Sequence, residues 1–484
     1  MCKWGKANNF FKGAKIKTDV CYMRILFVVY DNDSYVSVFP LGIAYLAAVC
    51  RNAGHEVDIY HQDVYHWPES HLLDLLNREW YDVIGIGVIG GYYQYRKLLK
   101  LSEAINRAKH RPYFILGGHG PAPDPAYFMK KTQADVVVIG EGELTVVELL
   151  DALKHKRELS SVQGIAFMQD GKCIRTPRRE LIQNIDEIPF PAWDMFPIDH
   201  YALLREPNIK NSDRCMLVLS GRGCTFTCNF CYRLDEGHRA RSSENIIEEI
   251  QILKKDYHIS YIDFQDELLM NSVRRTIELC ESFIKAKLNV KWICNGRLNY
   301  AKPEVVRLMK EAGCVFINYG IESMDEKALR AMNKALTIKQ IIAGIENTLA
   351  AEISPGFNII FGNIGETAES LRLGVEFLLK YDDHAQMRTI RPVTPYPGSP
   401  LYYYAIQKGL LKDCEDFYEN KHTNSDLLAV NFTNLTDNEF HTVLYDANKK
   451  LIEHYYVANL EKTIKNAQKL YFEKDATFRG FRQT

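Results

Sequence analysis

Gly221-Arg222-Gly223-Cys224-Thr225-Phe226-Thr227-Cys228-Asn229-Phe230-Cys231-Tyr232 carries three cysteines, separated by three and then two residues. The apolar run 215–220 that precedes this loop is typical of a buried strand. Three thiolates on one short loop can face a single iron–sulfur cube, which proteins usually hold with four thiolates. The three-cysteine set therefore leaves one iron with an open coordination site, where a metal centre does chemistry.

A zinc site or a disulfide framework would fit the cysteine loop less well. A structural zinc ion needs four closed ligands, and neither a second CxxC nor an HxxxH lies nearby in the sequence. A disulfide framework is disfavoured because residues 1–22 lack the continuous apolar core of a signal peptide, so we expect a reduced, cytoplasmic setting. The nine remaining cysteines are scattered, and we interpret most of them as small buried hydrophobic residues.

The composition is that of an ordinary globular enzyme, with 484 residues of which 46% are hydrophobic and 25% charged. Lys and Arg number 60 against 61 Asp and Glu, and the sequence has no basic stripe, so we expect no nucleic-acid partner. No apolar run in the sequence reaches the roughly 18 residues of a membrane span. The length favours about three domains.

The amino-terminal part alternates short apolar runs with amphipathic stretches. This alternation predicts a doubly wound, Rossmann-like (flavodoxin-like) parallel sheet of about five strands. Ligands of such sheets bind at the carboxyl ends of the strands, where this chain has polar and glycine-rich segments. The expected strands are 24–30, 56–60, 82–87, 113–116 and 135–139, and the segments at their ends include 31–37, 88–92, 117–120 and 140–143.

A second series of strands and helices follows the cysteine loop. Strands expected at 216–220, 261–264, 290–295, 315–319, 356–361 and 386–391 predict a partial (β/α)6 barrel, since eight units would need more chain. Between the two parts, an Asp-Gly turn at 170–171 predicts a hairpin, which a proline-rich linker follows. The expected organisation is a tail (1–22), the first domain (23–152), a hairpin and linker (153–212), the barrel (213–400) and a helical carboxyl-terminal region that we expect to cap the substrate (401–484).

The cysteine loop resembles the signature of the radical S-adenosylmethionine (SAM) enzymes, in which SAM chelates the fourth iron of a [4Fe-4S] cluster. The resemblance implies Cys224, Cys228 and Cys231 as cluster ligands, and reductive cleavage of SAM to a 5′-deoxyadenosyl radical that abstracts hydrogen from substrate. Asn363 stands where the family commonly has a proline. The resemblance also implies SAM contacts at the cysteine loop and the strand ends, namely Phe230, Asp266, Arg297, Glu322, Ser323 and Gly362.

Two of these contacts have a structural alternative. Asp266 could accept hydrogen bonds from the SAM ammonium group, or it could belong to an acidic pair that begins a helix capped by Asn271 and Ser272. Arg297 could bind a carboxylate of SAM or substrate, or it could form a salt bridge on the barrel rim. For Glu322, in a Gly-x-Glu-Ser element, we favour the functional interpretation.

The amino-terminal part, taken with the cysteine loop, resembles the cobalamin-binding domain of the B12-dependent radical SAM family. The Asp-x-His-x-x-Gly motif, whose histidine ligates cobalt in other B12 proteins, is absent, so the lower face of cobalt would be unligated or met by a loop residue. The alternative is a flavodoxin-like domain that binds something else or nothing, with His119 as a hydrogen-bonded loop residue. The implied cobalamin contacts are Tyr35, Pro40, Ile89, Gly90, Gly117, Gly118, His119, Gly140, Glu141 and Gly142.

The resemblance implies a cobalamin-dependent radical SAM methyltransferase that acts on an unactivated carbon or phosphorus of a small molecule. Electrons would come from a flavodoxin or ferredoxin. An alternative keeps both cofactors but forms or contracts a ring, or oxidises the substrate. A methylthiotransferase would need further amino-terminal cysteines, and Cys2, Cys21 and Cys50 are ill spaced for a second cluster. A cobalamin or SAM sensor without turnover is disfavoured by the intact cysteine set.

Overall fold

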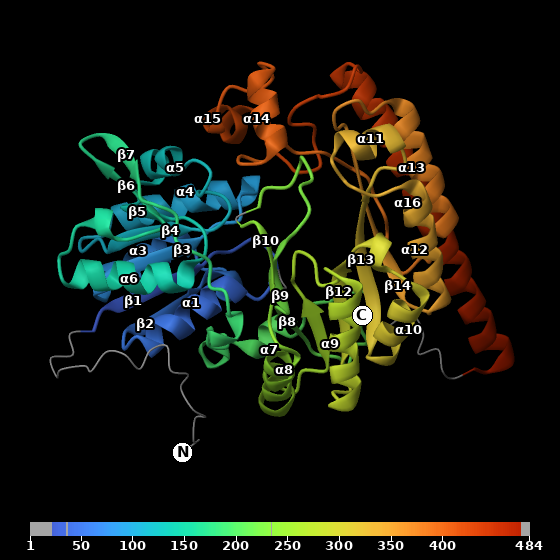
Figure 1. Ribbon diagram of the computed structural model, residues 1–484, viewed down its shortest axis with the longest axis horizontal. Helices are drawn as coiled ribbons and strands as arrows, with labels where there is room; N and C mark the ends of the chain where they lie inside the picture. The colour runs from blue at the N-terminus through green and yellow to red at the C-terminus, as the bar shows by residue number, and fades with distance from the viewer. Residues whose placement is uncertain (1–21, 35–36, 234, 476–484) are drawn as a thin grey trace.

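The computed structural model describes residues 22–34, 37–233 and 235–475. Two α/β parts lie side by side, and the carboxyl-terminal helices pack against both (Figure 1). Within the described ranges, no helix is long and apolar enough to cross a membrane. Residues 1–21 of the predicted tail (1–22) and the candidate Tyr35 lie outside the described residues.

The first sheet has the strand order β2-β1-β3-β4-β5-β6-β7, in which the first five strands are parallel. This order confirms the predicted flavodoxin-like fold, whose switch point lies between β1 and β3. The strands are β1 (Arg24–Val29), β2 (Glu56–His61), β3 (Val83–Gly87), β4 (Tyr113–Gly117) and β5 (Val136–Val138). The helices are α1 (Leu41–Asn52), α2 (Gln62–Tyr65), α3 (Glu69–Arg78), α4 (Tyr92–Asn106), α5 (Pro125–Thr132) and α6 (Gly142–Lys154).

The predicted hairpin is present as β6 (Ile165–Gln169) and β7 (Lys172–Arg175). Asp170 and Gly171 both have positive φ, which is the backbone of a two-residue hairpin turn. The hairpin adds antiparallel strands to the first sheet beside β5, so it extends that sheet instead of standing apart as a connector. A short turn, η2 (Leu159–Ser161), precedes the hairpin, and the linker after it contains η3 (Ile185–Glu187), η4 (Trp193–Met195) and α7 (Ile198–Tyr201).

The second sheet is parallel with the order β15-β14-β13-β12-β11-β8, and it curls into the predicted half-barrel. The cysteine loop is bounded by a separate antiparallel hairpin, β9 (Gly221–Cys224) and β10 (Gly237–Ala240). The barrel strands are β8 (Cys215–Val218), β11 (Tyr261–Phe264), β12 (Lys291–Gly296), β13 (Cys314–Glu322), β14 (Ser354–Phe361) and β15 (Arg391–Pro392). The helices are α8 (Ser243–Tyr257), α9 (Val273–Lys285), η5 (Leu298–Tyr300), α10 (Pro303–Glu311), α11 (Glu326–Ala331), α12 (Ile338–Ala350) and α13 (Ala368–Tyr381).

The strand expected at 386–391 is wrong, because only Arg391 and Pro392 pair with β14. Residues 382–390 form a loop instead. The Arg388 guanidinium donates hydrogen bonds to Asp382, Asp383 and the Pro355 carbonyl, and these contacts fix the loop without a strand ladder. Side-chain pairing therefore overrides the apolar alternation of this segment.

The carboxyl-terminal region divides between the two parts of the molecule. α14 (Pro400–Gln407), α15 (Cys414–Asp416) and η6 (Phe417–Lys421) bury apolar side chains in the core of the first sheet. α16 (Asp437–Gln468), continued by η7 (Lys469–Glu473), packs against α13 and runs along the outside of the barrel (Figure 1). Phe440 of α16 stacks on Phe361 at the end of β14, with ring centroids 4.8 Å apart.

Candidate functional site

The cysteine loop is held at the carboxyl end of β8. Cys224 ends β9, and Cys228 and Cys231 follow in the turn toward β10. The Asp266 carboxylate accepts hydrogen bonds from the backbone amides of Ser220, at 2.9 Å, and Gly221. Burial raises the pKa of Asp266 to about 6. In this structure Asp266 thus braces the strand end below the cysteines, and its contact with SAM stays a prediction.

The chemistry around the three thiols fits an iron–sulfur cluster. The Cys231 thiol donates to Cys228, and this bond, helped by the nearby positive charges of Lys334 and Arg297, lowers the pKa of Cys228 to about 6. A lowered pKa favours the thiolate, which is the form that binds metal. Cys231 is exposed, Cys224 is half-buried and Cys228 is buried.

Arg297, at the end of β12, lies against the cysteine loop. Its guanidinium carbon stands 3.4 Å from the centroid of the Phe226 ring, and its Nη2 donates to the carbonyl oxygens of Lys334 and, at 3.1 Å, Ala335. Burial lowers the pKa of this guanidinium. Arg297 is therefore an interior residue that braces the loop, not part of a salt bridge on the rim.

A buried ion pair stands between the end of β13 and the cysteine loop. Glu322, which has a φ of 70°, accepts from Lys334 Nζ at 2.8 Å, and their side chains are each 8% exposed. The ammonium group also lies 6.0 Å from the centroid of the Phe230 ring. Lys334 thus contacts both Glu322 and Phe230, and the contacts of these two residues with SAM stay predictions. Lys334 was missed, because a single lysine twelve residues after Glu322 forms no recognisable motif.

The segment at the end of β14 is tied to the cysteine loop by two asparagines. Asn229 and Asn363 exchange side-chain amide hydrogen bonds of 3.0 and 2.9 Å, and Asn363 is fully buried. The Glu366 carboxylate accepts from the backbone amides of Gly362 and Asn363, each at 2.9 Å, and from the Ser323 hydroxyl. The asparagine at the position of the family's proline therefore has a partner inside the cysteine motif.

The carboxyl edge of the first sheet forms a glycine cradle. Gly90, Gly118 and Gly140, which follow β3, β4 and β5, all have positive φ. A Cβ on Gly118 would lie 2.5 Å from the Val88 carbonyl oxygen, whereas one on Gly140 would meet no atom within 4 Å. Gly118 therefore serves close packing on Val88, whereas the open space at Gly140 fits the approach of a large planar ligand such as a corrin.

The other predicted cobalamin contacts surround this cradle. Ile89 is 73% exposed, which suits a residue that packs against a bound ligand. Pro40 precedes the first turn of α1, and Gly142 begins α6 against Leu46. Gly117 ends β4, and burial lowers the pKa of the His119 imidazole that follows.

The glycine cradle and the cysteine loop adjoin each other. The His119 ring meets the Tyr232 ring edge to face, with centroids 5.9 Å apart, and Tyr232 follows the last cysteine of the motif. Residues after β4 and after the cysteines thus touch, although more than a hundred positions separate them. This contact brings the two expected cofactor sites together.

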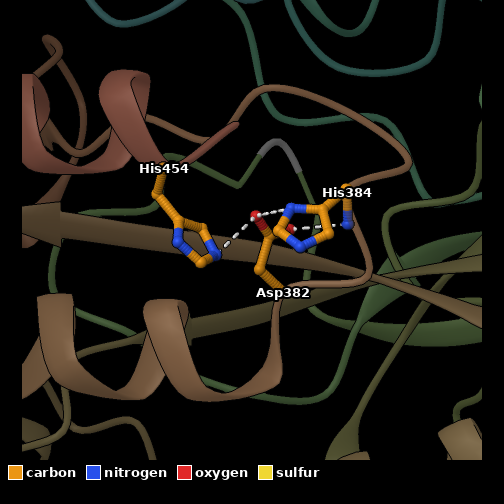
Figure 2. A group of neighbouring side chains, drawn as sticks. All are labelled: Asp382, His384 and His454. Carbon is orange, nitrogen blue, oxygen red and sulfur yellow. Dashed lines mark hydrogen bonds and ion pairs between the residues drawn. The ribbon is translucent and has the colours of Figure 1, made fainter. Parts of the chain in front are cut away.

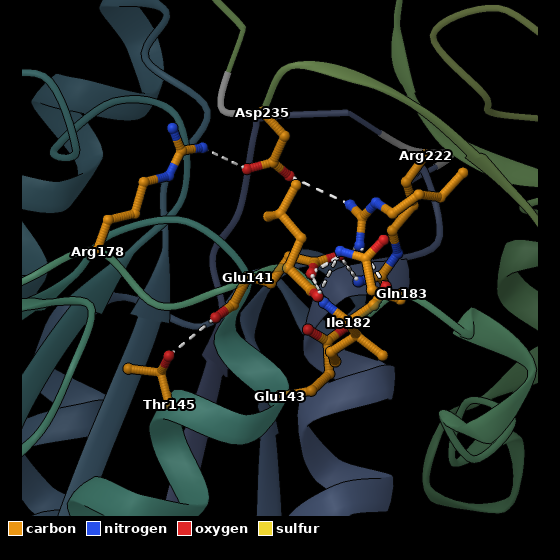
Figure 3. A network of polar contacts seen from close by, with 10 residues as sticks. Glu141, Glu143, Thr145, Arg178, Ile182, Gln183, Arg222 and Asp235 are labelled. Atoms are coloured by element: carbon orange, nitrogen blue, oxygen red, sulfur yellow. Dashed lines mark hydrogen bonds and ion pairs between the residues drawn. The ribbon is translucent and has the colours of Figure 1, made fainter.

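An ion-pair network joins the same two parts (Figure 3). Arg222 of β9 donates to Glu141 at 2.8 Å and to Glu143 at 2.6 Å, and Arg239 of β10 donates to the other Glu141 oxygen at 2.9 Å. These pairs hold both oxygens of Glu141, and Oε2 also accepts from the Ile182 amide at 3.0 Å. Glu141 therefore holds the β9–β10 hairpin against the first domain. The contact of Glu141 with cobalamin stays a prediction.

The inner face of the half-barrel carries a row of amides. Asn358 Nδ2 donates to Asn318, Asn318 Nδ2 donates to Asn295, each at 3.0 Å, and Asn295 Nδ2 donates to the Asp266 carbonyl at 2.8 Å. The flanking residues Ile317 and Tyr319 belong to the core on the other face of β13. Asn358 is exposed, so the row faces the open side of the sheet.

The half-barrel, the cysteine loop and the adjoining glycine cradle define an enzyme that places an iron–sulfur cluster next to a corrinoid. The sequence matches the model of the Radical SAM superfamily over residues 218–378 and that of the B12 binding domain over residues 28–150. The chain belongs to the B12-binding radical SAM family. It uses a [4Fe-4S] cluster, SAM and cobalamin.

Relatives and solved structures agree with this membership. The uncharacterized methyltransferase PH0819 of Pyrococcus horikoshii is 32% identical over 80% of this chain and 84% of its own length. The anaerobic magnesium-protoporphyrin IX monomethyl ester cyclase of Rubrivivax gelatinosus is 27% identical, over 82% of this chain and 72% of its own. The structure of the methyltransferase TsrM from Kitasatospora setae, with cobalamin and cluster bound, aligns with a TM-score of 0.65 at 16% identity, over 80% of this chain and 75% of that one.

Proposed function

We propose that this enzyme transfers a methyl group to an unactivated carbon or phosphorus of a small-molecule substrate. The observation that carries the proposal is the contact of the cysteine loop with the glycine cradle through His119 and Tyr232. A methyl carrier at the cradle would then face a radical generated at the loop. The relative of P. horikoshii, which matches most of both chains, is itself named as a methyltransferase.

The chain's own residues would bind, orient and shield the cofactors. Bound at these sites, the cluster supplies the electron that cleaves SAM, and cobalamin supplies the methyl group. Cys224, Cys228 and Cys231 would hold the cluster. Lys334 and Arg297 lie close enough to stabilise its negative charge.

SAM would lie along the strand ends that face the loop. Phe230, Glu322 and the Gly362 segment would hold it there, as the family resemblance implies. The Asn229–Asn363 amide pair keeps that segment against the loop. Fixing the reactants in this way is the main catalytic contribution that a protein makes to cofactor chemistry.

The substrate would enter over the amide row of the half-barrel. Asn295, Asn318 and Asn358 offer both donors and acceptors on the inner face, below the expected position of SAM. A substrate with neutral polar groups suits this surface better than a purely apolar one. In this proposal a flavodoxin or ferredoxin delivers the electrons, and the enzyme works in the cytoplasm, where its cysteines stay reduced.

A second candidate keeps the same cofactors and closes a ring without methyl transfer. The Rubrivivax cyclase favours it, because its identity to this chain, at 27%, approaches that of the methyltransferase. The two candidates differ in the fate of the methyl group of SAM. A methyltransferase places it on the product, whereas a cyclase does not.

Methyl-labelled SAM tests the proposal directly. We would incubate the reconstituted protein, cobalamin and a low-potential reductant with a metabolite extract and the labelled SAM, and follow products by mass spectrometry. We expect 5′-deoxyadenosine and a product that carries the labelled methyl group. 5′-Deoxyadenosine with an unlabelled, cyclised product would favour the second candidate, and absence of both products would contradict the radical mechanism.

The matched variants are Cys228→Ala and Cys173→Ala. Cys228 lies in the motif, whereas Cys173 is a half-buried cysteine of the β6–β7 hairpin. Wild type should hold about four irons per chain. We expect Cys228→Ala to lose most of this iron and to form no 5′-deoxyadenosine, whereas Cys173→Ala should keep both the iron and the activity. Equal iron in the two variants would refute the assignment of the cluster ligands.

A further inference from the structure

A second group of metal-binding side chains lies away from the cofactor site. Asp382, His384 and His454 offer one carboxylate oxygen and two imidazole nitrogens within 4.8 Å of one another. Asp382 follows the end of α13, His384 is in the loop after it, and His454 projects from α16 (Figure 2). Figure 2 shows both imidazole rings turned toward the same carboxylate.

The two oxygens of Asp382 have different surroundings. Oδ1 accepts from Arg388 Nε at 2.9 Å and from the His384 backbone amide at 3.1 Å. Oδ2 faces the two rings, 3.1 Å from His384 Nδ1 and 3.7 Å from His454 Nε2. A carboxylate with one oxygen held by hydrogen bonds and the other turned inward is arranged as a monodentate metal ligand.

The inward ring nitrogens lack hydrogen bonds. His384 Nδ1 and His454 Nε2 are both shielded from solvent, and neither has a hydrogen-bond partner among the described residues. The ring centroids are 4.8 Å apart. Their contacts with Asp382 Oδ2 are ion-pair contacts without hydrogen-bond geometry, and a metal ion between the three atoms would satisfy both nitrogens at once.

The scaffold around this triad is already fixed. Asn448 of α16 donates to the Ile390 carbonyl at 3.0 Å and accepts from its amide at 2.8 Å, so α16 is locked to the same loop. The side chains of Asp382, His384 and His454 are 6%, 36% and 35% exposed, which leaves a path for an ion. The ligands therefore need little movement to close on a metal.

The triad is far from the cysteines. Arg388 also contacts the Pro355 carbonyl at the amino end of β14, whereas Asn363, beside the cysteine loop, follows the carboxyl end of the same strand. An eight-residue strand spans about 20 Å or more. The triad thus lies on the opposite end of the barrel from the radical chemistry.

We propose that Asp382, His384 and His454 bind one zinc-type divalent ion that fastens α16 to the loop after α13. Two imidazoles and a carboxylate are a common ligand set for zinc, and a water molecule can complete the tetrahedron. The fourth position, left to water, makes this an open site, unlike the closed four-ligand sites of structural zinc, and its place away from the cysteines separates it from the radical chemistry. The alternative is an ordinary pair of histidines beside an aspartate, with no ion bound.

Zinc content of the cluster-loaded protein tests this site. We would compare wild type, His454→Ala, His384→Ala and the control His441→Ala, which removes an exposed histidine of the same helix. After incubation with Zn²⁺ and gel filtration, zinc and iron would be counted by elemental analysis. We expect about one zinc per chain in wild type and His441→Ala, and about a tenth of that in the two triad variants, with iron unchanged in all four.

Thermal unfolding gives an independent readout. Added Zn²⁺ should raise the unfolding temperature of wild type and His441→Ala, because an ion that binds only the folded state stabilises it. His454→Ala should show no such rise. Equal zinc content in wild type and His454→Ala, or an equal rise in unfolding temperature, would overturn the proposal.

Discussion

At the scale of single residues, the Asn229–Asn363 pair ties the segment after β14 to the cysteine loop. Asn363→Ala would remove both hydrogen bonds of this pair and leave the Asn229 side chain only its bond to the Ala331 carbonyl. We expect the free energy of unfolding to fall by about 1–3 kcal/mol and the cluster to be lost faster in air. Urea unfolding and the decay of the cluster absorbance would measure the two effects. The exposed Asn358, on the preceding strand β14, is the control, and equal effects of Asn358→Ala and Asn363→Ala would contradict the prediction.

The cysteine ligands could be predicted from local spacing, whereas their neighbours could not. Cys224, Cys228 and Cys231 lie within one loop, so their chemistry is visible in the sequence. Lys334 and Asn363 reach that loop only through the closure of the half-barrel, across more than a hundred residues. Neither has a motif of its own, and a buried lysine is recognised only when its partner, Glu322, is placed.

At the scale of elements, Glu366 makes the β14–α13 turn sensitive to pH. Burial raises its pKa to about 7, above the value of about 4.3 for an unfolded chain. The folded state therefore binds more protons between these values, and its stability falls as the pH rises through that window. Glu366→Gln removes this titration. We expect the free energy of unfolding of the wild type, relative to Glu366→Gln, to drop by about 3 kcal/mol from pH 5 to pH 8.

Urea midpoints at several pH values would measure this difference. Glu369→Gln is the matched control, because Glu369 is an exposed acid in the first turn of α13. Its pH profile should run parallel to that of the wild type. If the stability of Glu366→Gln depends on pH in the same way as that of the wild type, protonation of Glu366 does not stabilise the turn.

Most elements could be predicted because buried strands and helices leave recognisable patterns of apolar residues in the sequence. Strands such as β1 and β8 are largely apolar runs, and β8, just before the cysteine loop, begins the half-barrel. Long-range contacts that the local sequence pattern does not encode decided the exceptions. The β6–β7 hairpin joined the first sheet, and Arg388 held 382–390 as a loop through Asp382 and Asp383.

At the scale of the whole molecule, the position of one cofactor site against the other depends on the ion pairs around Arg222. The exposed Arg51–Asp194 pair also joins the first domain to the linker, and its residues are 33% and 50% exposed. Exposed pairs contribute about 0–1 kcal/mol, so Arg51→Met should change stability little. The Arg222 and Glu143 side chains are only 17% and 8% exposed, which makes their pair the stronger link.

A double-mutant cycle on Arg222 and Glu143 tests this link. Glu143 is the better partner to remove, because Glu141 is also held by Arg239. Arg222→Met should lower the free energy of unfolding by about 3–5 kcal/mol, since it leaves the buried Glu143 carboxylate unpaired. Glu143→Gln should lower it by less, because Arg222 keeps its ion pair with Glu141. The double variant should lose less than the sum, by about 0.5–3 kcal/mol. Cleavage of the 177–184 linker by trypsin and retention of cobalamin should follow the same order. Strictly additive losses, or linker cleavage no faster than in Arg51→Met, would mean that other contacts hold the two sites together.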